Sequence, residues 1–593
     1  MTIGFRNINE VWASILVETW KRLGLTCAII CPGSRSTPLV VAFTQQKPHI
    51  EVIPILDERS GAFFALGRAK VTGTPTAIVC TSGTAGANFY PAVIEATESR
   101  IPLLILTADR PQELRNCHSG QTINQLRLYG DYPNWQTELA IPSEDMRMLS
   151  YLRQTAIHAW ERTLHPIGGI VHLNIPFRDP LAPTFDNLAK DTLSLNKLKS
   201  QFNTKEFFTN LRCDRPITLS NPTFPVLEWL QTSRGIIIAG VSQPQKPEEY
   251  SYAISRLTAL LNFPVLAEAL SPLRNYAQLN SNIISTYDII LRNPQLATKL
   301  KPEIVIQIGE MPTSKILRNW LTATNAQRWI IEPSDQNLDP LHGRTIHIRI
   351  GVEEIGEWKF KSENQQENID KNSPYLQMWR SLHNQVKEKI DVTLAQTTEL
   401  FEGKVAWLLS QILPPQTSLF ISNSMPVRDV EFFWQNNNLG IRAFCNRGAN
   451  GIDGTLSTAL GIAYQQQSSV MLTGDLGLLH DTNGFLIRNK FIGHLTILLI
   501  NNNGGGIFEM LPISGFEPPF EEYFATPQNI NFAQLCTTYG IEHELITSWE
   551  QLKNKLNPLP DKGIRILEIP TNRKNDAKWR QENFAKIANE IYQ

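Results

Sequence analysis

The pattern of apolar and polar positions predicts a chain in which helices and strands alternate. Near the start, apolar residues recur at helical spacing, and Gly24 supplies an end for that helix. The residues with this spacing are Ile8, Val11, Trp12, Ile15, Leu16, Thr19, Trp20 and Leu23. Mostly apolar runs, typical of buried strands, lie at 50–56, 76–79, 170–176, 470–473 and 495–500. This α/β alternation implies mostly parallel sheets flanked by helices and joined by right-handed crossovers.

The length of 593 residues is too great for one core and predicts roughly three domains. Four strands are predicted in the middle of the chain, at 235–239, 264–267, 304–308 and 329–332. We expect a first domain at 1–183, a polar connector at 184–215, a middle α/β domain at 216–355, a polar linker at 356–374 and a last domain at 375–593. A turn at Gly240 resembles the start of a nucleotide site, but it lacks the G-x-G-x-x-G pattern, which argues against NAD.

Composition narrows the class of protein. Lys and Arg number 55 against 56 Asp and Glu, a net charge of −1 that argues against a nucleic-acid partner. No apolar run approaches the ~20 residues of a membrane helix, and the first residues lack the apolar core of a signal peptide. The seven cysteines are scattered without a CxxC pair, which predicts reduced thiols and a cytoplasmic location.

The strongest chemical signal lies in the last third of the chain. One predicted strand runs into Gly474 and Asp475, and the next runs into the triplet 501–503, which is three asparagines. Open α/β sheets bind ligands at the carboxyl ends of their strands. Carboxylate and amide oxygens suit Mg²⁺, which leaves coordination positions open for phosphate oxygens. A helix predicted over 478–487 would direct its amino end at the same anion. A strand-end Asp followed by a polar turn is the plain alternative.

The pairing resembles the cofactor motif of thiamine-diphosphate-dependent enzymes, Gly-Asp-x followed by Asn-Asn after a helix and a strand. The resemblance implies that Asp475, Asn502 and the backbone carbonyl of Gly504 hold Mg²⁺ or Mn²⁺. It also implies that Gly474 and Leu476 line the diphosphate. The register of the metal-binding Asn within the triplet stays open.

Such an enzyme also needs an acid beside the pyrimidine ring of its cofactor. The strand predicted at 50–56 is followed by Glu58 and an apolar helix, which resembles the strand–Glu–helix element of the pyrimidine-binding domain. Ser82 and Gly83 lie in a Thr-Ser-Gly segment similar to that of related decarboxylases and synthases. Ile452 lies where the family places an apolar side chain beneath the cofactor. A helix-start Glu and an ordinary core Ile are the plain alternatives.

Longer strings are more specific. They occupy 31–38, 107–111, 312–315, 423–429 and 446–454. Their order and spacing closely resemble the 2-succinyl-5-enolpyruvyl-6-hydroxy-3-cyclohexene-1-carboxylate synthases, thiamine-diphosphate enzymes of menaquinone and phylloquinone biosynthesis. Five basic residues follow predicted strands or occupy Gly/Pro-rich turns: Arg35, Arg110, Lys315, Arg428 and Arg447. Arg binds carboxylates with two parallel hydrogen bonds, so this set predicts a small polyanionic substrate.

The resemblance implies a transferase that decarboxylates 2-oxoglutarate and adds the succinyl carbanion to isochorismate, with Glu58 promoting cofactor activation. Ser424 and Arg428 would hold the part derived from 2-oxoglutarate. Substrate carboxylates or hydroxyls would meet Ser34, Arg35, Arg110, Gln121, Lys315 and Arg447. Ile507, Leu511 and Tyr523 would form an apolar wall, and Ser424 and Ile507 would also touch the cofactor.

Three further expectations follow from the resemblance. The active site would lie at a subunit interface, which predicts a homodimer or a homotetramer. Another thiamine-diphosphate enzyme, a 2-oxoacid decarboxylase or an acetolactate-type synthase, is the nearest alternative, although a small monocarboxylate needs fewer positive partners. A scaffold without catalysis is the remaining alternative, and it conflicts with the presence of Glu58, Asp475 and Asn502 together.

Overall fold

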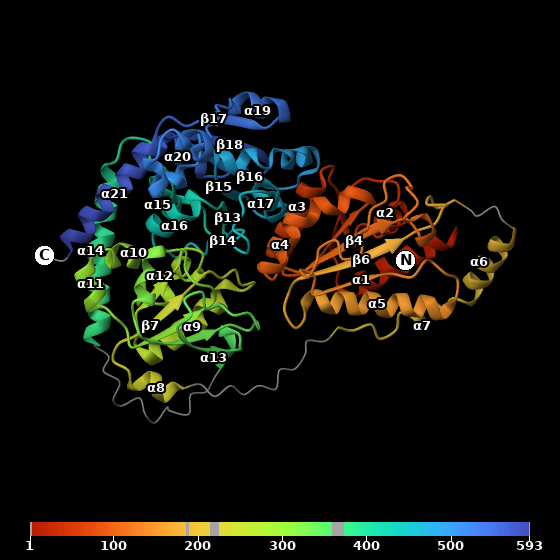
Figure 1. The fold of residues 1–593 in the computed structure, drawn as a ribbon, viewed down its shortest axis with the longest axis horizontal. Coiled ribbons are helices and arrows are strands. Elements are labelled where there is room, and N and C mark those ends of the chain that lie inside the picture. The colour runs from red at the N-terminus through yellow and green to blue at the C-terminus, as the bar shows by residue number, and fades with distance from the viewer. Residues whose placement is uncertain (1–2, 185–188, 214–224, 358–372, 592–593) are drawn as a thin grey trace. The chain divides into compact units, whose positions relative to one another are not determined.

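The computed structural model describes residues 3–184, 189–213, 225–357 and 373–591, and Figure 1 follows the chain through its elements. Most of the predicted linker at 356–374 lies outside these residues, as does part of the predicted connector at 184–215. The described part of the connector forms α6 (Ala189–Gln201) and α7 (Thr204–Phe207), so this stretch is more helical than its polar sequence indicated.

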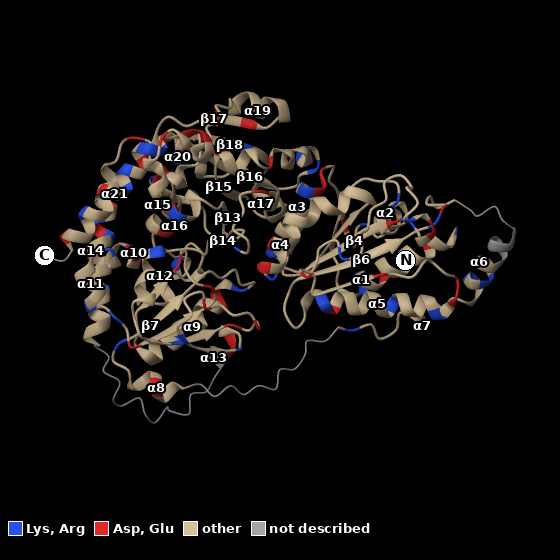
Figure 2. Ribbon diagram, viewed as in Figure 1, with Lys and Arg blue, Asp and Glu red and all other residues tan. Residues whose placement is uncertain are grey.

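The chain divides into two compact units. Unit 1 comprises Met1–Thr218, Asn446–Gln465 and His480–Ile492, and unit 2 comprises Leu219–Cys445, Gln466–Leu479 and Gly493–Gln593. Residues of both signs are interspersed along the elements of each unit (Figure 2), in keeping with the net charge of −1. Among the helices of the described residues, none combines the length and the apolar content that crossing a bilayer requires.

Unit 1 is built on a six-stranded parallel sheet. Its strands are β1 (Cys27–Ile30), β2 (Glu51–Pro54), β3 (Thr76–Cys80), β4 (Leu103–Asp109), β5 (Trp135–Glu138) and β6 (Ile170–Pro176), in the spatial order β2-β1-β3-β4-β6-β5. Besides α6 and α7, its α-helices are α1 (Ile8–Leu23), α2 (Thr37–Thr44), α3 (Glu58–Thr72), α4 (Tyr90–Glu98), α5 (Met146–Leu164) and α17 (Thr455–Ala463).

The predicted first helix is confirmed at both ends. Asn7 caps the amino end of α1 by accepting from the backbone N–H of Glu10, and Gly24 ends the helix in the left-handed conformation that glycine tolerates. Trp12 and Trp20 on its apolar face are fully buried in the core of unit 1. Burial of such large side chains is the main stabilisation that an amphipathic helix receives.

The middle sheet, in unit 2, also has six parallel strands. They are β7 (Gly235–Ala239), β8 (Val265–Ala267), β9 (Ile283–Ile284), β10 (Ile304–Ile308), β11 (Gln327–Ile331) and β12 (Arg344–Ile348), in the order β12-β11-β10-β7-β8-β9. The four strands predicted here are confirmed within a few residues. A side chain on Gly240 would lie 1.6 Å from the carbonyl oxygen of Glu310, so the chain itself fills the space beyond the first strand.

The third sheet, also in unit 2, has the same strand order as the first. Its strands are β13 (Ser418–Ile421), β14 (Arg442–Phe444), β15 (Ser469–Gly474), β16 (His494–Asn501), β17 (Glu542–Leu545) and β18 (Gly563–Pro570), in the order β14-β13-β15-β16-β18-β17. Counted from its own first strand, each of the two sheets reads 2-1-3-4-6-5. The prediction of three parallel α/β sheets, with one fold used in the first and last, is therefore confirmed.

Thirteen α-helices of the described residues surround the two sheets of unit 2. They are α8 (Val226–Gln231), α9 (Pro247–Leu261), α10 (Tyr287–Leu291), α11 (Pro294–Lys299), α12 (Lys315–Thr322), α13 (Val352–Glu357), α14 (Pro374–Gln396), α15 (Glu402–Ile412), α16 (Met425–Phe433), α18 (Asp475–Leu479), α19 (Phe532–Tyr539), α20 (Trp549–Leu556) and α21 (Arg573–Glu590).

The α-helix predicted over 478–487 is wrong. The structure has instead the five-residue α18 and then a 3₁₀ helix, η6 (Thr482–Lys490). The buried carboxylate of Asp481 lies between them and accepts from the backbone N–H of Ser457, and this tertiary contact interrupts the helical ladder. A helix as short as α18 offers little dipole, so anion binding here must depend on side chains and individual N–H groups.

Helices α3 and α17 of unit 1 pack backbone against backbone through two glycines. A Cβ on Gly67 would lie 2.1 Å from the carbonyl oxygen of Thr458, and one on Gly461 would lie 2.2 Å from that of Phe64. Only glycine permits this approach, so these two positions set the distance between the helices.

We expect Gly67→Ala to destabilise unit 1. The added methyl group would force the two helices apart, and overpacking of this kind costs about 1–3 kcal/mol, more than Ala gains in helix propensity. The measurement is the urea midpoint of unfolding. Gly120→Ala is the matched control, because a Cβ at Gly120 meets no atom within 4 Å. Equal midpoints for the two variants would contradict the packing argument.

Candidate functional site

The carboxyl ends of β15 and β16 bring Asp475 and the asparagine triplet together in unit 2. The two strands pair in parallel, with Gly474 opposite Ile500, so both chains leave the same edge of the sheet. Asp475 is buried and its Oδ2 accepts from the backbone N–H of Gly504 at 2.8 Å. The acid predicted from the sequence therefore lies directly against the glycine predicted beside it.

The three asparagines differ in what their side chains do. Asn501 donates to Glu568 at 2.7 Å, and Asn503 exchanges hydrogen bonds with Asn529. Asn502 is 7% exposed and donates its Nδ2 to Glu402 at 3.1 Å, while its buried Oδ1 has no hydrogen-bond partner among the described residues. Burying an acceptor oxygen without a hydrogen-bond donor costs free energy, and a bound cation would offset that cost. Among the three asparagines, Oδ1 of Asn502 is therefore the best candidate ligand for a cation.

The donor set fits a divalent metal. Burial raises the pKa of Asp475 to about 6, and the charge of Glu402 adds to the rise, while the N–H groups of Leu476 and Gly504 oppose it. A cation beside this carboxylate would restore its ionised form. A Cβ on Gly474 would meet no atom of the described residues within 4 Å, which leaves open space next to Asp475 for a ligand.

A buried ion cluster lies behind Asn502. The guanidinium of Arg580 donates to Oε1 of Glu402 at 2.7 Å and to Oδ1 of Asp429 at 2.6 Å. A carboxylate oxygen of Asp576 accepts from the backbone N–H of Glu402 at 3.3 Å. Burial raises the pKa of Asp429 to about 7 and that of Asp576 to about 8, while the charge of Arg580 opposes both shifts. Through the contact between Glu402 and Asn502, the cluster connects helices α15, α16 and α21 to the loop that follows β16.

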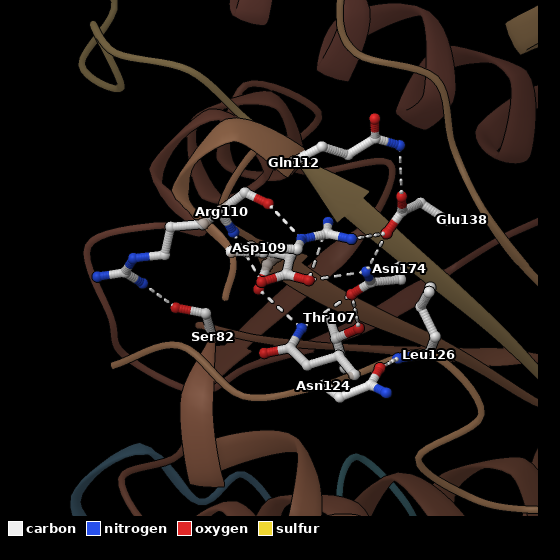
Figure 3. Close-up of polar contacts among 12 residues, drawn as sticks. Ser82, Thr107, Asp109, Arg110, Gln112, Asn124, Leu126, Glu138 and Asn174 are labelled. Carbon is white, nitrogen blue, oxygen red and sulfur yellow. Dashed lines mark hydrogen bonds and ion pairs between the residues drawn. The ribbon is translucent and has the colours of Figure 1, made fainter. Parts of the chain in front are cut away.

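In unit 1, the turn after β3 brings four of the predicted residues together: Ser82, Gly83, Arg110 and Gln121. A guanidinium nitrogen of Arg110 donates to Oγ of Ser82 (Figure 3). Nε2 of Gln121 donates to the backbone carbonyl of Ser82 at 2.9 Å. Gly83 has a φ of +86°, and a Cβ there would lie 2.8 Å from the side chain of Gln121. The backbone N–H of Gly83 donates to Gln125 at 2.9 Å. Glycine is required at this turn on both counts.

Two guanidinium groups lie near that turn. Arg35 donates to the backbone carbonyl of Phe177 at 3.0 Å and lies 3.5 Å from Asp179, while its own N–H reaches Thr81. Burial lowers the pKa of Arg110, and the charge of Arg35 lowers it further. Ser34 is exposed in the loop beside Arg35. The two guanidinium charges repel each other, so together they favour an anion with more than one carboxylate.

A network of polar side chains holds the backbone of Arg110 in place (Figure 3). The buried Asn174 donates to Asp109 at 2.9 Å and to Glu138 at 2.8 Å, and Arg115 lies 3.1 Å and 2.7 Å from the same two carboxylates. Nε of Arg115 donates to the backbone carbonyl of Arg110 at 3.0 Å. Strands β4, β5 and β6 therefore fix the backbone from which Arg110 projects.

Glu58 begins helix α3, directly after Asp57, whose side chain caps that helix by accepting from the N–H of Ser60. Glu58 is partly exposed. Glu58 follows β2 and Ser82 follows β3, and both of these strands pair in parallel with β1. Glu58 therefore belongs to the same edge of the first sheet as the turn at Ser82.

Arg447 and Ile452 lie on the segment of unit 1 that precedes α17, and both are partly exposed. This segment is tied to α4, because the N–H groups of Gly448 and Ala449 donate to the buried carboxylate of Glu95 at 3.1 Å and 2.7 Å. The contact fixes the backbone beside Arg447.

The other predicted residues lie in unit 2. Ser424 has a φ of +73° and a ψ of −129°, a strained backbone for a residue with a side chain, and its carbonyl accepts from Arg428 at 2.6 Å. Strain of this kind concentrates at functional sites. Lys315 is exposed at the first residue of α12, which Ser314 caps.

The predicted apolar wall lies on the segment that follows β16, which contains the short 3₁₀ helices η7 (Gly506–Met510) and η8 (Pro512–Gly515) and the π-helix η9 (Glu521–Ala525). Ile507 is partly exposed, while Leu511 and Tyr523 are 42% and 67% exposed. Arg573 ties this segment to α21, since it donates to the carbonyl of Asn503 at 2.9 Å and to Glu509 at 3.0 Å. Exposed apolar groups on a braced loop suit contact with a ligand or another surface.

Sequence reasoning missed the residues that brace the site, among them Gln125, Glu402, Arg573 and Arg580. They belong to no motif, and Glu402 lies 100 residues from the asparagine that it contacts. An apolar segment, 405–409, follows Glu402, but nothing in it marks the acid as a partner of the metal loop.

Models of three protein domains match the chain in order. They are the N-terminal TPP binding domain of thiamine pyrophosphate enzymes at 11–128, a middle domain of thiamine pyrophosphate enzymes at 195–421, and their C-terminal TPP binding domain at 432–568.

Curated relatives match over nearly the full length. Proteins named 2-succinyl-5-enolpyruvyl-6-hydroxy-3-cyclohexene-1-carboxylate synthase are 64% identical in a Nostoc species, over 99% of both chains, and 60% identical in Gloeothece citriformis, over 99% of this chain and all of the relative. The one in Acaryochloris marina is 54% identical over the whole of both chains. The chain therefore belongs to the thiamine pyrophosphate enzymes and, among them, to the family of these synthases.

Proposed function

We propose that this chain is a thiamine-diphosphate-dependent transferase that releases CO₂ from 2-oxoglutarate and joins the remaining succinyl unit to isochorismate, in menaquinone or phylloquinone biosynthesis. The observation that carries the proposal is the 64% identity, over 99% of both chains, to a Nostoc protein with the name of that synthase. The geometry of the turn at Ser82 in unit 1 supports the same conclusion, as does that of Asp475 and Asn502 in unit 2.

Asp475, Asn502 and the backbone carbonyl of Gly504 would hold Mg²⁺ or Mn²⁺ against the diphosphate of the cofactor. The buried Oδ1 of Asn502, which has no hydrogen-bond partner within the described residues, supports this role and favours Asn502 over its two neighbours. Gly474 and Leu476 would lie beside the diphosphate, where the open space at Gly474 admits it. Thiamine diphosphate, when bound, supplies a nucleophilic ring carbon and an electron sink for decarboxylation.

The chain's own residues would orient the substrates and manage protons. Glu58 would hold a proton at the pyrimidine ring, and Ile452 would support the cofactor from below. Ser82, Gly83 and Gln121 would shape the floor of the substrate site. A dicarboxylate between Arg35 and Arg110 would neutralise two guanidinium groups whose charges otherwise repel each other.

The remaining predicted residues complete the proposal. Ser34, Lys315 and Arg447 would contact substrate carboxylates or hydroxyls, and Ser424 with Arg428 would hold the part derived from 2-oxoglutarate. Ile507, Leu511 and Tyr523 would exclude water from the reacting atoms. We further propose a cytoplasmic homodimer or homotetramer. In it, the first domain of one subunit, with Glu58, would meet the last domain of another subunit, with Asp475, at a subunit interface.

Substrate preference tests the proposal most simply. With Mg²⁺ and thiamine diphosphate, purified protein should consume isochorismate, followed by its ultraviolet absorbance, in the presence of 2-oxoglutarate and should do so far more slowly with pyruvate. The reason is that the basic set provides partners for a second carboxylate, and each charged hydrogen bond contributes about 1.5–3 kcal/mol. Faster turnover with pyruvate would instead indicate an acetolactate-type enzyme or another decarboxylase.

Glu58→Gln should abolish most CO₂ release while the fold persists. The amide keeps the size of the side chain but cannot exchange a proton, and loss of a general acid–base group typically costs about 10²–10⁴-fold in rate. Arg59→Lys, on the neighbouring residue, is a control for changes at the start of α3. Release within a few-fold of the wild-type rate would remove Glu58 from the mechanism.

Gly474→Ala should separate cofactor binding from stability. A methyl group there meets no protein atom within 4 Å, so the unfolding midpoint without cofactor should change little. The same methyl group would occupy the space assigned to the diphosphate, and we expect affinity for thiamine diphosphate with Mg²⁺, measured by calorimetry, to fall at least about tenfold, or 1.4 kcal/mol. Gly515→Ala, also in open space, is the matched control. Unchanged affinity would move the diphosphate elsewhere.

A further inference from the structure

The two ends of an asparagine side chain are nearly the same shape but have opposite chemistry. The oxygen can ligate a cation, whereas the NH₂ group can only donate hydrogen bonds. A metal ligand of this type therefore needs a neighbour that fixes which end faces the metal, as outer partners commonly do for metal-binding side chains.

Glu402 is placed to do this for Asn502. Its Oε2 accepts from Nδ2 of Asn502 at 3.1 Å. An ionised carboxylate only accepts, so it requires the NH₂ end of the amide on its side. The oxygen of Asn502 then points the other way, and it is the atom that is buried without a hydrogen-bond partner in the part of the chain that the structure describes.

Glu402 is itself held in place. It begins helix α15, its side chain is 3% exposed, and its Oε1 accepts from Arg580 at 2.7 Å. The same guanidinium binds Asp429, and the backbone N–H of Glu402 donates to Asp576 at 3.3 Å. With one carboxylate oxygen occupied by Arg580, the other is left to face the amide.

We propose that Glu402 is a positioning residue of the metal site, which turns the amide oxygen of Asn502 toward the cation and is anchored for that purpose by Arg580. The inference rests on the proposed function, because it assumes that Asn502 ligates the metal that holds the diphosphate. Glu402 itself touches neither substrate nor cofactor in this scheme.

The test compares metal affinity in full-length variants. Mn²⁺ binding is measured by electron paramagnetic resonance at saturating thiamine diphosphate, and folding is followed by urea unfolding. We expect Glu402→Gln to weaken Mn²⁺ binding about 10–100-fold, the range found for changes to such outer partners, because Gln can pair with either end of the amide. Glu399→Gln is the matched control, an exposed acid three residues earlier. Its affinity should equal that of the wild type.

A swap of donor and acceptor separates orientation from simple charge attraction. Asn502→Asp has two equivalent oxygens, so no orientation is needed, and a Gln at 402 can donate to it. Adding Glu402→Gln to Asn502→Asp should therefore leave Mn²⁺ affinity unchanged or raise it. An equal loss in both backgrounds would mean that Glu402 acts only through its charge, and the proposal would be wrong.

The remaining outcomes are also distinct. If Glu402→Gln does not fold, Glu402→Asp keeps the buried charge beside Arg580 but withdraws it from Asn502, and it should weaken Mn²⁺ binding about tenfold. Wild-type affinity in whichever of these variants folds would overturn the positioning role. Failure of the wild-type protein to bind Mn²⁺ with thiamine diphosphate would instead remove the proposed function on which the inference stands.

Discussion

The buried guanidinium of Arg580 is the charge on which the candidate metal site of unit 2 depends. It is 1% exposed and lies among Glu402, Asp429 and Asp576, three carboxylates that would otherwise be buried with too little positive charge. Removing one partner of such a cluster typically costs about 3–5 kcal/mol. Because Glu402 also holds Asn502, the same ion cluster that keeps helices α15, α16 and α21 together sets the geometry of the candidate metal site.

The first and third sheets use one strand order for two kinds of chemistry. At the carboxyl edge of the first sheet, the turn at Ser82 gathers guanidinium and amide donors suited to carboxylates. At the corresponding edge of the third sheet, Asp475 and Asn502 present oxygens suited to a cation. The strand order brings these loops to one edge, and the loops themselves determine what is bound there.

Much of this architecture could be predicted from local pattern. The helix ending at Gly24 and the strands leading to Asp475 carry strong periodic or apolar signals, and the structure has them. The motif also predicted that Asp475 and Gly504 lie close together. The α-helix predicted over 478–487 is absent from the structure because Asp481 makes a tertiary contact that no local pattern reveals.

The bracing of the site could not be predicted. Glu402 meets Asn502 across 100 residues and Arg580 across 178, and each contact depends on how whole helices pack on the third sheet. The sequence also could not show which of the three asparagines is the candidate metal ligand, because the three residues are identical. Only their tertiary contacts distinguish Asn502, whose buried oxygen has no hydrogen-bond partner among the described residues, from its neighbours.

We propose that Asp475, Asn502 and the carbonyl of Gly504 together hold the cation that binds the cofactor diphosphate. A crystal structure of the protein with thiamine diphosphate and Mg²⁺ tests it most directly. We expect Mg²⁺ about 2.0–2.1 Å from one oxygen of each of these residues, with phosphate and water oxygens completing the octahedron. A metal bound by Asn501 or Asn503 instead, or a diphosphate bound away from Gly474, would contradict it.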